Sequence, residues 1–342
     1  MSERANRAEA AATAAVDDAA LRRLRVAIIG YGEVGGIIGR ALRAHPLASI
    51  RTYDRLFDDP ARRDALHRRA RDDGIDAVSS AIAAVRGADL VFSAVTAAET
   101  LTAARAVAPE LDAGAFYIDL NSASPQAKCS GAAAINDAGG RYIEMAVMAS
   151  VPPHGIRVPM LSGGPHAAAL APLLATLGFK VTPASDRYGV ASAIKMCRSV
   201  IVKGMEAIVI ESLLTARQYG VEQPVLSSLA ESFPGLDWEA TGTYFFQRVI
   251  EHGRRRAEEM REAAVTVRES GLEPLMATAT AERQAWLAAL VAARGPALPR
   301  SAPWRDWADW ITRITLPASR VPTLRCRLPA AGADAGTEPP AR

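Results

Sequence analysis

Cysteine, histidine and long apolar runs are scarce in this chain of 342 residues. The three cysteines, Cys129, Cys197 and Cys326, lie far apart and form no CxxC pair, so we expect reduced thiols and no disulfide framework. The five histidines form no HxxxH or HExxH pair, which argues against a protein-bound metal. No run approaches the roughly 18 apolar residues that a membrane span requires, so no membrane partner is expected.

Net charge is also small. The formal charge is +3, and arginines are interspersed with acids along the chain, so a nucleic-acid partner is not expected. The first twenty residues carry four acids and lack the apolar core of a secretory signal peptide, which predicts a cytoplasmic protein. The length predicts about two domains, and a chain of this size buries enough surface to fold without disulfides or a metal.

What the chain does contain is a glycine-rich turn after its first apolar run. The run Val26–Ile29 ends in a GxGxxG spacing, which opens a segment of helical pattern. The first glycine makes the tight turn, the second lets the backbone approach a pyrophosphate, and the third lets helix and strand pack closely. The turn therefore predicts a dinucleotide site. The predicted contact residues are Gly30, Tyr31, Gly32, Glu33, Val34 and Gly35.

A second strand candidate ends in Asp54, 19 residues after Gly35, where a dinucleotide fingerprint expects an acid about 20 residues on. Its carboxylate is placed to accept ribose hydroxyls and to repel a 2′-phosphate, so we favour NAD as cofactor. Arg55 beside it would attract such a phosphate, which leaves NADP open. A glycine-rich turn with a merely solvated Asp54 is the alternative interpretation.

Strand and helix patterns alternate from residue 23 to 188, which predicts a Rossmann-type doubly wound α/β domain. One apolar strand leads into Val95 and Thr96, and ligands of such sheets bind at the carboxyl ends of strands, so both are expected at the cofactor. From residue 189 to 295 only helical patterns occur, which predicts an all-α domain. Residues 1–22 and most of 296–342 are predicted to be disordered tails, with one further helix possible at Trp304, Trp307 and Trp310.

The order of motifs resembles the β-hydroxyacid dehydrogenase superfamily, which includes 3-hydroxyisobutyrate and 6-phosphogluconate dehydrogenases. Three further elements carry the resemblance: residues 119–125 (Asp-Leu-Asn-Ser-Ala-Ser-Pro), the pair Gly163-Gly164, and residues 189–199, which look like the GxGxxxKxxNN element. The segment around Lys203 is similar to the subgroup with a phosphogluconate dehydrogenase-like C-terminal domain. Met148 stands where the family has a carboxylate-binding serine, so the substrate stays open.

The resemblance implies NAD(P)-dependent hydride transfer at a hydroxyl-bearing carbon of a small 3-hydroxy acid, with Lys195 as the catalytic residue. A lysine buried beside the cofactor would have a lowered pKa, as a proton-transfer group requires. It also implies that the helical domain, residues 189–295, is the substrate and dimerisation domain, through which a homodimer forms. The substrate-binding residues that we expect are Asn121, Ser122, Arg198, Ser199 and His252.

Each assignment has a simpler alternative. Lys195 taken alone is more often a surface lysine, Asn121 and Ser122 are also turn and helix-capping residues, and His252 lies on a helix with a charged, solvated face. At the level of function, a decarboxylating dehydrogenase, an imine reductase and a non-catalytic NAD-binding protein all remain possible on this scaffold.

Overall fold

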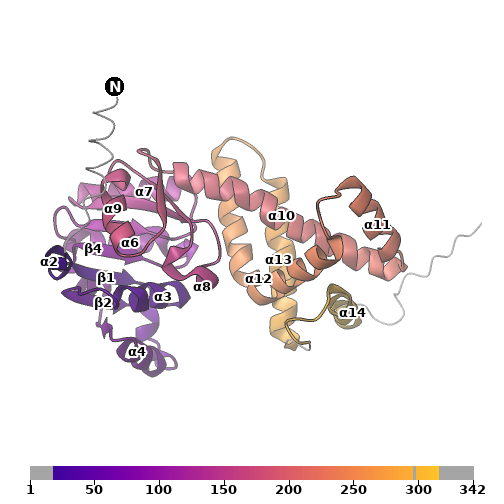
Figure 1. The fold of residues 1–342 in the computed structure, drawn as a ribbon, viewed down its shortest axis with the longest axis horizontal. Helices are drawn as coiled ribbons and strands as arrows, with labels where there is room; N and C mark the ends of the chain where they lie inside the picture. The colour runs from indigo at the N-terminus through magenta and orange to yellow at the C-terminus, as the bar shows by residue number, and fades with distance from the viewer. Residues whose placement is uncertain (1–17, 296–297, 316–342) are drawn as a thin grey trace, which may run out of the picture. The chain divides into compact units, whose positions relative to one another are not determined.

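The computed structural model describes residues 18–295 and 298–315 of the chain. A single eight-stranded sheet is followed by long helices (Figure 1). The sheet order is β3-β2-β1-β4-β5-β6-β7-β8, and all neighbouring strands are parallel except the antiparallel pair β6 and β7. The strands are β1 (Arg25–Ile29), β2 (Ser49–Tyr53), β3 (Asp76–Ala77), β4 (Leu90–Ser93), β5 (Phe116–Asp119), β6 (Arg141–Val147), β7 (Met160–Gly163) and β8 (Val181–Ser185).

Helices cover both faces of the sheet, as the alternating sequence pattern predicted. Successive residues of β1 point to opposite faces, so Val26 and Ile28 belong to one core cluster and Ala27 and Ile29 to the other. On the first face the covering helices are α3 (Glu33–Leu42), α8 (Val151–His154) and α9 (Ala167–Thr176). On the second face they are α5 (Ala81–Val85), α6 (Thr100–Val107) and α7 (Pro125–Asp137). The doubly wound fold is therefore confirmed.

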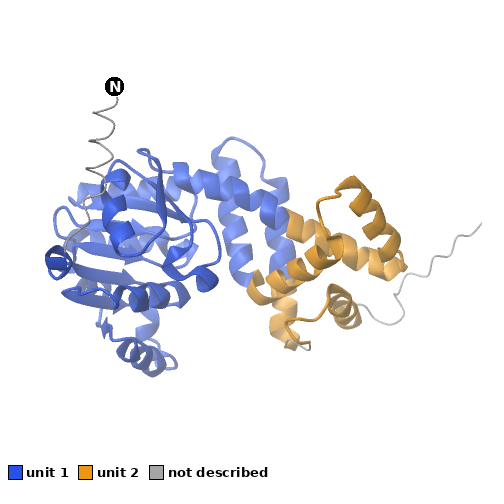
Figure 2. Ribbon diagram, in the orientation of Figure 1, with its two compact units in different colours: residues 1–204, 254–286 blue, residues 205–253, 287–342 orange. Residues whose placement is uncertain are grey.

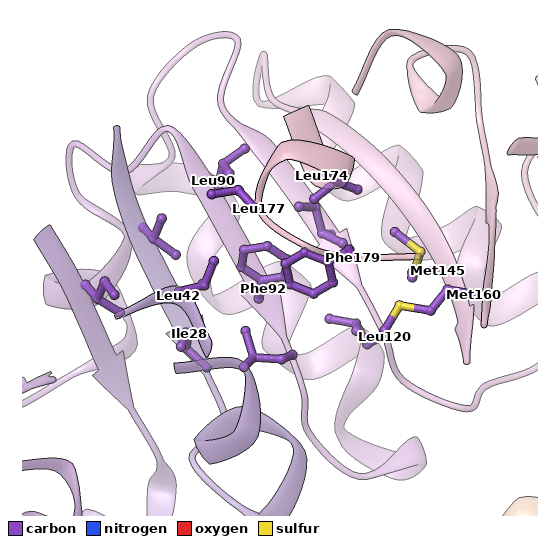
Figure 3. Close-up of a cluster of buried hydrophobic side chains, with 14 of the residues drawn as sticks. Ile28, Leu42, Leu90, Phe92, Leu120, Met145, Met160, Leu174, Leu177 and Phe179 are labelled. Atoms are coloured by element: carbon purple, nitrogen blue, oxygen red, sulfur yellow. The ribbon is translucent and has the colours of Figure 1, made fainter. Parts of the chain in front are cut away.

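Aromatic stacking marks the centre of the first core (Figure 3). Phe92 of β4 stacks on Phe179, with ring centroids 5.3 Å apart and an interplanar angle of 10°. Leu90 lies on the same strand, and Leu174 and Leu177 come from the α9 segment that covers it. Burial of this kind contributes about 1.5–3 kcal/mol for each large apolar side chain and fixes the sheet that carries the site.

Strands end at β8, and the rest of the described chain is helical, as expected. The helices are α10 (Val190–Tyr219), α11 (Glu222–Ser232), α12 (Trp238–Glu269), α13 (Leu275–Arg294) and α14 (Trp304–Thr315). The expected change at residue 189 coincides with the start of α10. Earlier in the chain, α2 (Asp18–Leu21) and α4 (Arg63–Asp72) complete the α-helices, with short 3₁₀ turns at Arg55–Phe57, Ala97–Glu99, Ala108–Glu110 and Gly155–Arg157.

Two compact units divide the long helices (Figure 2). The first combines Met1–Gly204 with Arg254–Trp286, so the start of α10, the end of α12 and much of α13 group with the sheet. The second combines Met205–Gly253 with Leu287–Arg342. Its core is rich in aromatic side chains, among them Trp238, Phe246, Trp304 and Trp307.

The tail predictions are only partly within the described residues. Residues 1–17, 296–297 and 316–342, with Cys326 among them, lie outside the description. Within the predicted N-terminal tail, α2 buries Leu21 in the first core cluster. Within the predicted C-terminal tail, α14 is ordered, because Trp304, Trp307 and Trp310 recur every three residues and bury one large apolar face.

Candidate functional site

The glycine turn joins β1 to α3 and leaves one side open. Gly30 has φ +92°, and a Cβ there would lie 2.5 Å from the carbonyl oxygen of Ala94. A Cβ on Gly35 would lie 2.0 Å from the carbonyl oxygen of Gly30, so this glycine lets α3 approach the strand. A Cβ on Gly32 would meet nothing within 4 Å. The first and third glycines shape the turn, and the second presents open backbone for a ligand.

Gly32 is also the N-cap of α3, and no side chain caps that helix. A helix start of this kind offers backbone N–H groups and the positive end of the helix dipole, which suits a pyrophosphate. Glu33 is exposed and Val34 half-buried on the same first turn. The Tyr31 side chain points away from this surface, since it is fully buried and its hydroxyl donates to Asp73 at 2.5 Å. The Tyr31 side chain is therefore not available to a ligand at the turn, which would meet only the backbone of this residue.

Asp54 follows β2 and braces the same turn. One carboxylate oxygen accepts the backbone N–H of Tyr31 at 2.7 Å, and the other accepts that of Leu56 at 2.9 Å. Each oxygen retains a lone pair, so ribose hydroxyls remain acceptable partners. Arg55 pairs with Glu99 at 2.6 Å in an exposed position. Thus the residue that would attract a 2′-phosphate already has a carboxylate partner.

The carboxyl end of β4 lies beside the turn. A Cβ on Gly30 would approach Cγ1 of Val95 to 3.1 Å, and the backbone N–H of Val95 donates to Oδ1 of Asn121 at 2.7 Å. Thr96 follows directly and precedes a 3₁₀ turn. The structure thus places these expected cofactor residues at the edge of the sheet where parallel folds bind ligands.

Asn121 is part of this framework. Its side-chain amide also donates to Oγ of Ser93 at 3.0 Å, and its backbone N–H donates to Asp119 at 2.9 Å. The residue is 4% exposed. These bonds connect the loop after β5 to the end of β4. Asn121 thus has a structural role in the turn, whether or not it also binds substrate.

Ser122, the next residue, meets Lys195. The ammonium of Lys195 donates to Oγ of Ser122 at 2.5 Å, across 73 residues of sequence. Desolvation by burial is the main cause that lowers the pKa of Lys195 to about 8. Glu259 raises that pKa, whereas the cations Lys203, Lys128 and Arg255 lower it further. A lysine with such a pKa exchanges its proton near neutral pH, which an ordinary surface lysine does not.

A buried ion pair holds the loop that carries Ser122. Lys128 of α7 binds a carboxylate oxygen of Asp119 at 2.9 Å and the backbone carbonyl of the same residue at 3.1 Å. The second carboxylate oxygen accepts the hydroxyl of Tyr142 at 2.5 Å. Both charged side chains are 1% exposed. Because each charge is paired and hydrogen-bonded, the pair is tolerated inside the protein and fixes the end of β5.

Glu144 holds the helix that carries Lys195. Its carboxylate accepts backbone N–H groups from Gly189, at 2.6 Å, and Ser192 at the start of α10, an arrangement that suits the positive end of a helix. The Ser192 hydroxyl donates in turn to the backbone carbonyl of Ala123. A Cβ on Gly163 would lie 2.8 Å from the Glu144 carboxylate, so this glycine of the predicted pair makes room for the cap. The loop and the helix are therefore braced together.

The other three expected substrate residues are Arg198, Ser199 and His252. Arg198 is exposed on α10. Ser199 is 5% exposed, and its hydroxyl accepts the ammonium of Lys203 at 3.1 Å. His252 is half-buried in the second compact unit, 3.8 Å from Glu251. Within the described residues, the bond from Lys195 to Ser122 joins the expected catalytic residue to an expected substrate-binding residue.

Four residues around the site were not expected from the sequence, namely Lys128, Lys203, Glu144 and Glu259. One signal was present: only four of the 40 lysine and arginine residues are lysine, at positions 128, 180, 195 and 203. Three of these four surround the site. Glu259 gave no comparable signal, because glutamate is common throughout the helical region, and Glu144 is a single acid within a strand.

Residues 25–184 match the family described as the NAD binding domain of 6-phosphogluconate dehydrogenase. Residues 216–287 match a domain of unknown function, DUF1932. A conserved hypothetical protein from Sinorhizobium meliloti 1021 is 38% identical, and the match covers 85% of this chain and 96% of that one with a TM-score of 0.69. The chain belongs to the β-hydroxyacid dehydrogenase superfamily.

Two other solved structures agree with that placement. A conserved protein of unknown function, described as structurally similar to 3-hydroxyacid dehydrogenases, is 29% identical over 78% of this chain and 98% of its own, with a TM-score of 0.62. The 3-hydroxyisobutyrate dehydrogenase of Mycobacterium tuberculosis, solved with L-serine, shares the fold at 17% identity over 82% and 97% of the two chains, with a TM-score of 0.63.

Membership in this superfamily assigns the chain to the NAD(P)-dependent oxidoreductases as a class, with NAD or NADP as cofactor and no substrate specified. The open backbone at Gly32 and the uncapped start of α3 fit such a dinucleotide. Among the described residues, no helix is long and apolar enough to cross a membrane. Nor does that part of the chain bring three or more His, Cys, Asp or Glu side chains together as metal ligands.

Proposed function

We propose that the protein transfers a hydride between a nicotinamide cofactor, preferably NAD, and the hydroxyl-bearing carbon of a small polar 3-hydroxy acid. The observation that carries the proposal is the contact between Lys195 and Ser122. It puts a lysine of lowered pKa against a hydroxyl at the carboxyl end of β5, on the sheet edge that also carries the dinucleotide turn.

The cofactor would be held by residues of the turn and the neighbouring strand ends. Backbone at Gly32 and the start of α3 suit the pyrophosphate, Asp54 suits the adenosine ribose, and Val95 and Thr96 border the path along the sheet. When bound, the nicotinamide supplies the hydride acceptor or donor, chemistry that no side chain of the protein provides.

Lys195 would move the proton. In the oxidising direction the substrate carbon loses a hydride, its hydroxyl O–H bond breaks, and the proton passes to the neutral amine of Lys195. In the reducing direction the ammonium returns that proton to the carbonyl oxygen. Ser122 accepts a hydrogen bond from Lys195 and so orients the amine toward the substrate position. A pKa of about 8 keeps both protonation states populated near neutral pH.

The substrate class rests on the superfamily. The charge of the site adds little to it, because Lys128 is paired with Asp119, and Lys203 and Arg255 are both paired with Glu259. The proposed substrate contacts are Asn121, Ser122, Arg198, Ser199 and His252. Of these, Ser122 has direct support from its bond to Lys195.

A substrate screen tests this proposal. The protein is incubated with a panel of 3-hydroxy acids and either NAD⁺ or NADP⁺, and in reverse with the matching oxo acids and the reduced cofactors, while nicotinamide absorbance is followed. Mass spectrometry of the products separates simple oxidation from oxidation with loss of CO₂, and an amine added to the reverse reaction detects imine reduction. Tight NADH binding without turnover of any hydroxy acid, oxo acid or imine would show a non-catalytic dinucleotide-binding protein.

We also infer a homodimer formed through the helices. Ile194, Ile201 and Ile208 recur every seven residues along α10 and are 43%, 67% and 55% exposed in the single chain. Apolar side chains at this spacing form one stripe on a helix, and such a stripe is covered when a partner packs against it. Light scattering at micromolar concentration should give twice the chain mass, and a monomer would reject the dimer.

A further inference from the structure

Lysine is used sparingly in this chain, and its placement is uneven. Four of the 40 lysine and arginine residues are lysine. Lys180 is exposed, whereas Lys128 and Lys203 are buried and Lys195 is half-buried at the site. Arginine cannot replace a lysine whose role depends on a compact ammonium or on losing a proton. The positions that carry lysine near the site therefore call for a role, and Lys203 has none in the proposed reaction.

Lys203 lies on the same stripe of α10 as Lys195. Residues 195, 199 and 203 are four apart, so they follow one another on successive turns of the helix. The ammonium of Lys203 donates to Oγ of Ser199 at 3.1 Å and pairs with Glu259 of α12 at 3.0 Å. The side chains of Lys203 and Glu259 are only 8% and 15% exposed. This is a nearly buried ion pair, two turns from Lys195.

Glu259 is the carboxylate of a mainly cationic group. Arg255 of α12 binds its other oxygen at 3.0 Å. Burial raises the pKa of Glu259, but Lys203, Lys195 and Arg255 together outweigh it and lower that pKa to about 2. Glu259 is therefore ionised at every working pH. Of the charged groups that act on Lys195, Glu259 favours the ammonium, and Lys203, Lys128 and Arg255 disfavour it.

We propose that Glu259 and Lys203 are positioning residues for Lys195, which fix the charge around its ammonium and so set the pH at which it exchanges a proton. The inference rests on the proposed function, in which that exchange is the catalytic proton transfer. The pair accounts for the burial of Lys203 two turns from another cation. Lys203 partly neutralises the charge of Glu259, so Glu259 stabilises the ammonium form of Lys195 less and Lys195 can lose its proton.

The two partners predict opposite effects. Glu259→Gln removes the negative charge and leaves Lys195 among cations, so its titration midpoint should fall by at least about one pH unit. Lys203→Met removes a cation and frees Glu259 to interact with Lys195, so the midpoint should rise. General damage to the fold would open the site to water and move the midpoint toward an ordinary lysine in both variants, so a fall in Glu259→Gln distinguishes the proposal.

Competitive acetylation of the full chain measures the midpoint without any substrate. Protein is pulsed with trace acetic anhydride at a series of pH values, and peptide mass spectrometry then gives the labelling of each lysine. Exposed Lys180 is the internal reference. Glu258→Gln is the matched control, since Glu258 precedes Glu259 on α12 and pairs with exposed Arg254 at 3.7 Å. Glu259→Asp retains the charge and should keep the Lys195 midpoint near that of the unchanged protein.

A lower Lys195 titration midpoint in Glu259→Gln together with a higher midpoint in Lys203→Met supports the proposal. An unchanged midpoint in both, or shifts of the same sign, overturns it. If Glu259→Gln does not fold, a Lys195 midpoint in Lys203→Met that falls or stays unchanged overturns the proposal. A rise supports it only where the melting temperature of that variant matches that of the unchanged protein. Because the assay needs no turnover, these shifts can occur even where Lys195→Ala retains full activity. Opposite midpoint shifts together with full activity of Lys195→Ala would reject Lys195 as the catalytic residue but would still support the effect of Glu259 and Lys203 on its titration.

Discussion

Replacing Gly32 by valine should remove dinucleotide binding while leaving the fold intact. The backbone at this position has φ −73°, which any residue adopts, and an added Cβ meets no atom of the protein within 4 Å. The valine side chain would instead fill the space over the open backbone, where the pyrophosphate is expected. Loss of one or two charge-assisted hydrogen bonds costs about 3 kcal/mol, which is roughly a hundredfold in Kd.

The assay is a titration with NADH followed by fluorescence or calorimetry, with the melting temperature measured in parallel. Gly235→Val is the matched control, because Gly235 also has open space around it and lies in the second compact unit. Gly35→Ala gives the contrasting case, since its Cβ would lie 2.0 Å from backbone and should lower the melting temperature. Unchanged NADH affinity in Gly32→Val would refute the role of this turn.

Three further predictions concern the cofactor, the pH profile and the buried ion pair. Asp54→Ala should narrow or reverse a preference for NADH over NADPH; tenfold tighter NADPH binding by the unchanged protein would oppose the assignment. Oxidation requires the neutral amine of Lys195, so kcat/KM for oxidation should rise about tenfold per pH unit below the Lys195 pKa of about 8 and level off above it. A profile that is flat from pH 6 to 9 would exclude Lys195 as the base. Lys128→Met should lower the free energy of unfolding by about 3–5 kcal/mol, because it leaves the buried carboxylate of Asp119 without its cation. Arg86→Ala removes an exposed ion pair and should lower it by at most about 1 kcal/mol. Equal losses in chemical denaturation would show that the buried pair does not stabilise the fold.

Much of the sheet domain could be predicted from the sequence. The apolar strands buried on both faces, the glycine spacing and the acid at Asp54 are local signals, and the structure places them as expected. Lys195 was singled out because residues 189–199, at the start of the long helix α10, resemble the GxGxxxKxxNN element of the family. These features depend on residues close together in the chain, which is what pattern and propensity report.

The supports of the site could not be predicted in this way. Glu144 caps a helix that begins 46 residues later, and Lys203 meets Glu259 across 56 residues. The bonds from the Asn121 side chain to Val95 and Ser93 likewise join segments that are far apart in the sequence. Such contacts depend on how α10 and α12 pack, and no periodicity in the sequence encodes that packing.

The most direct test of the account is the turnover of Lys195→Ala with a substrate identified in the screen. Loss of a positioned proton-transfer group typically slows the reaction about 10²- to 10⁴-fold, whereas NADH is held by the glycine turn and Asp54. We therefore expect normal NADH affinity with turnover reduced at least about a hundredfold, and no rescue in Lys195→Arg, because a guanidinium stays protonated. Near-normal kcat in the alanine variant would contradict the central claim and assign the proton transfer to another residue, with His252 the first to test.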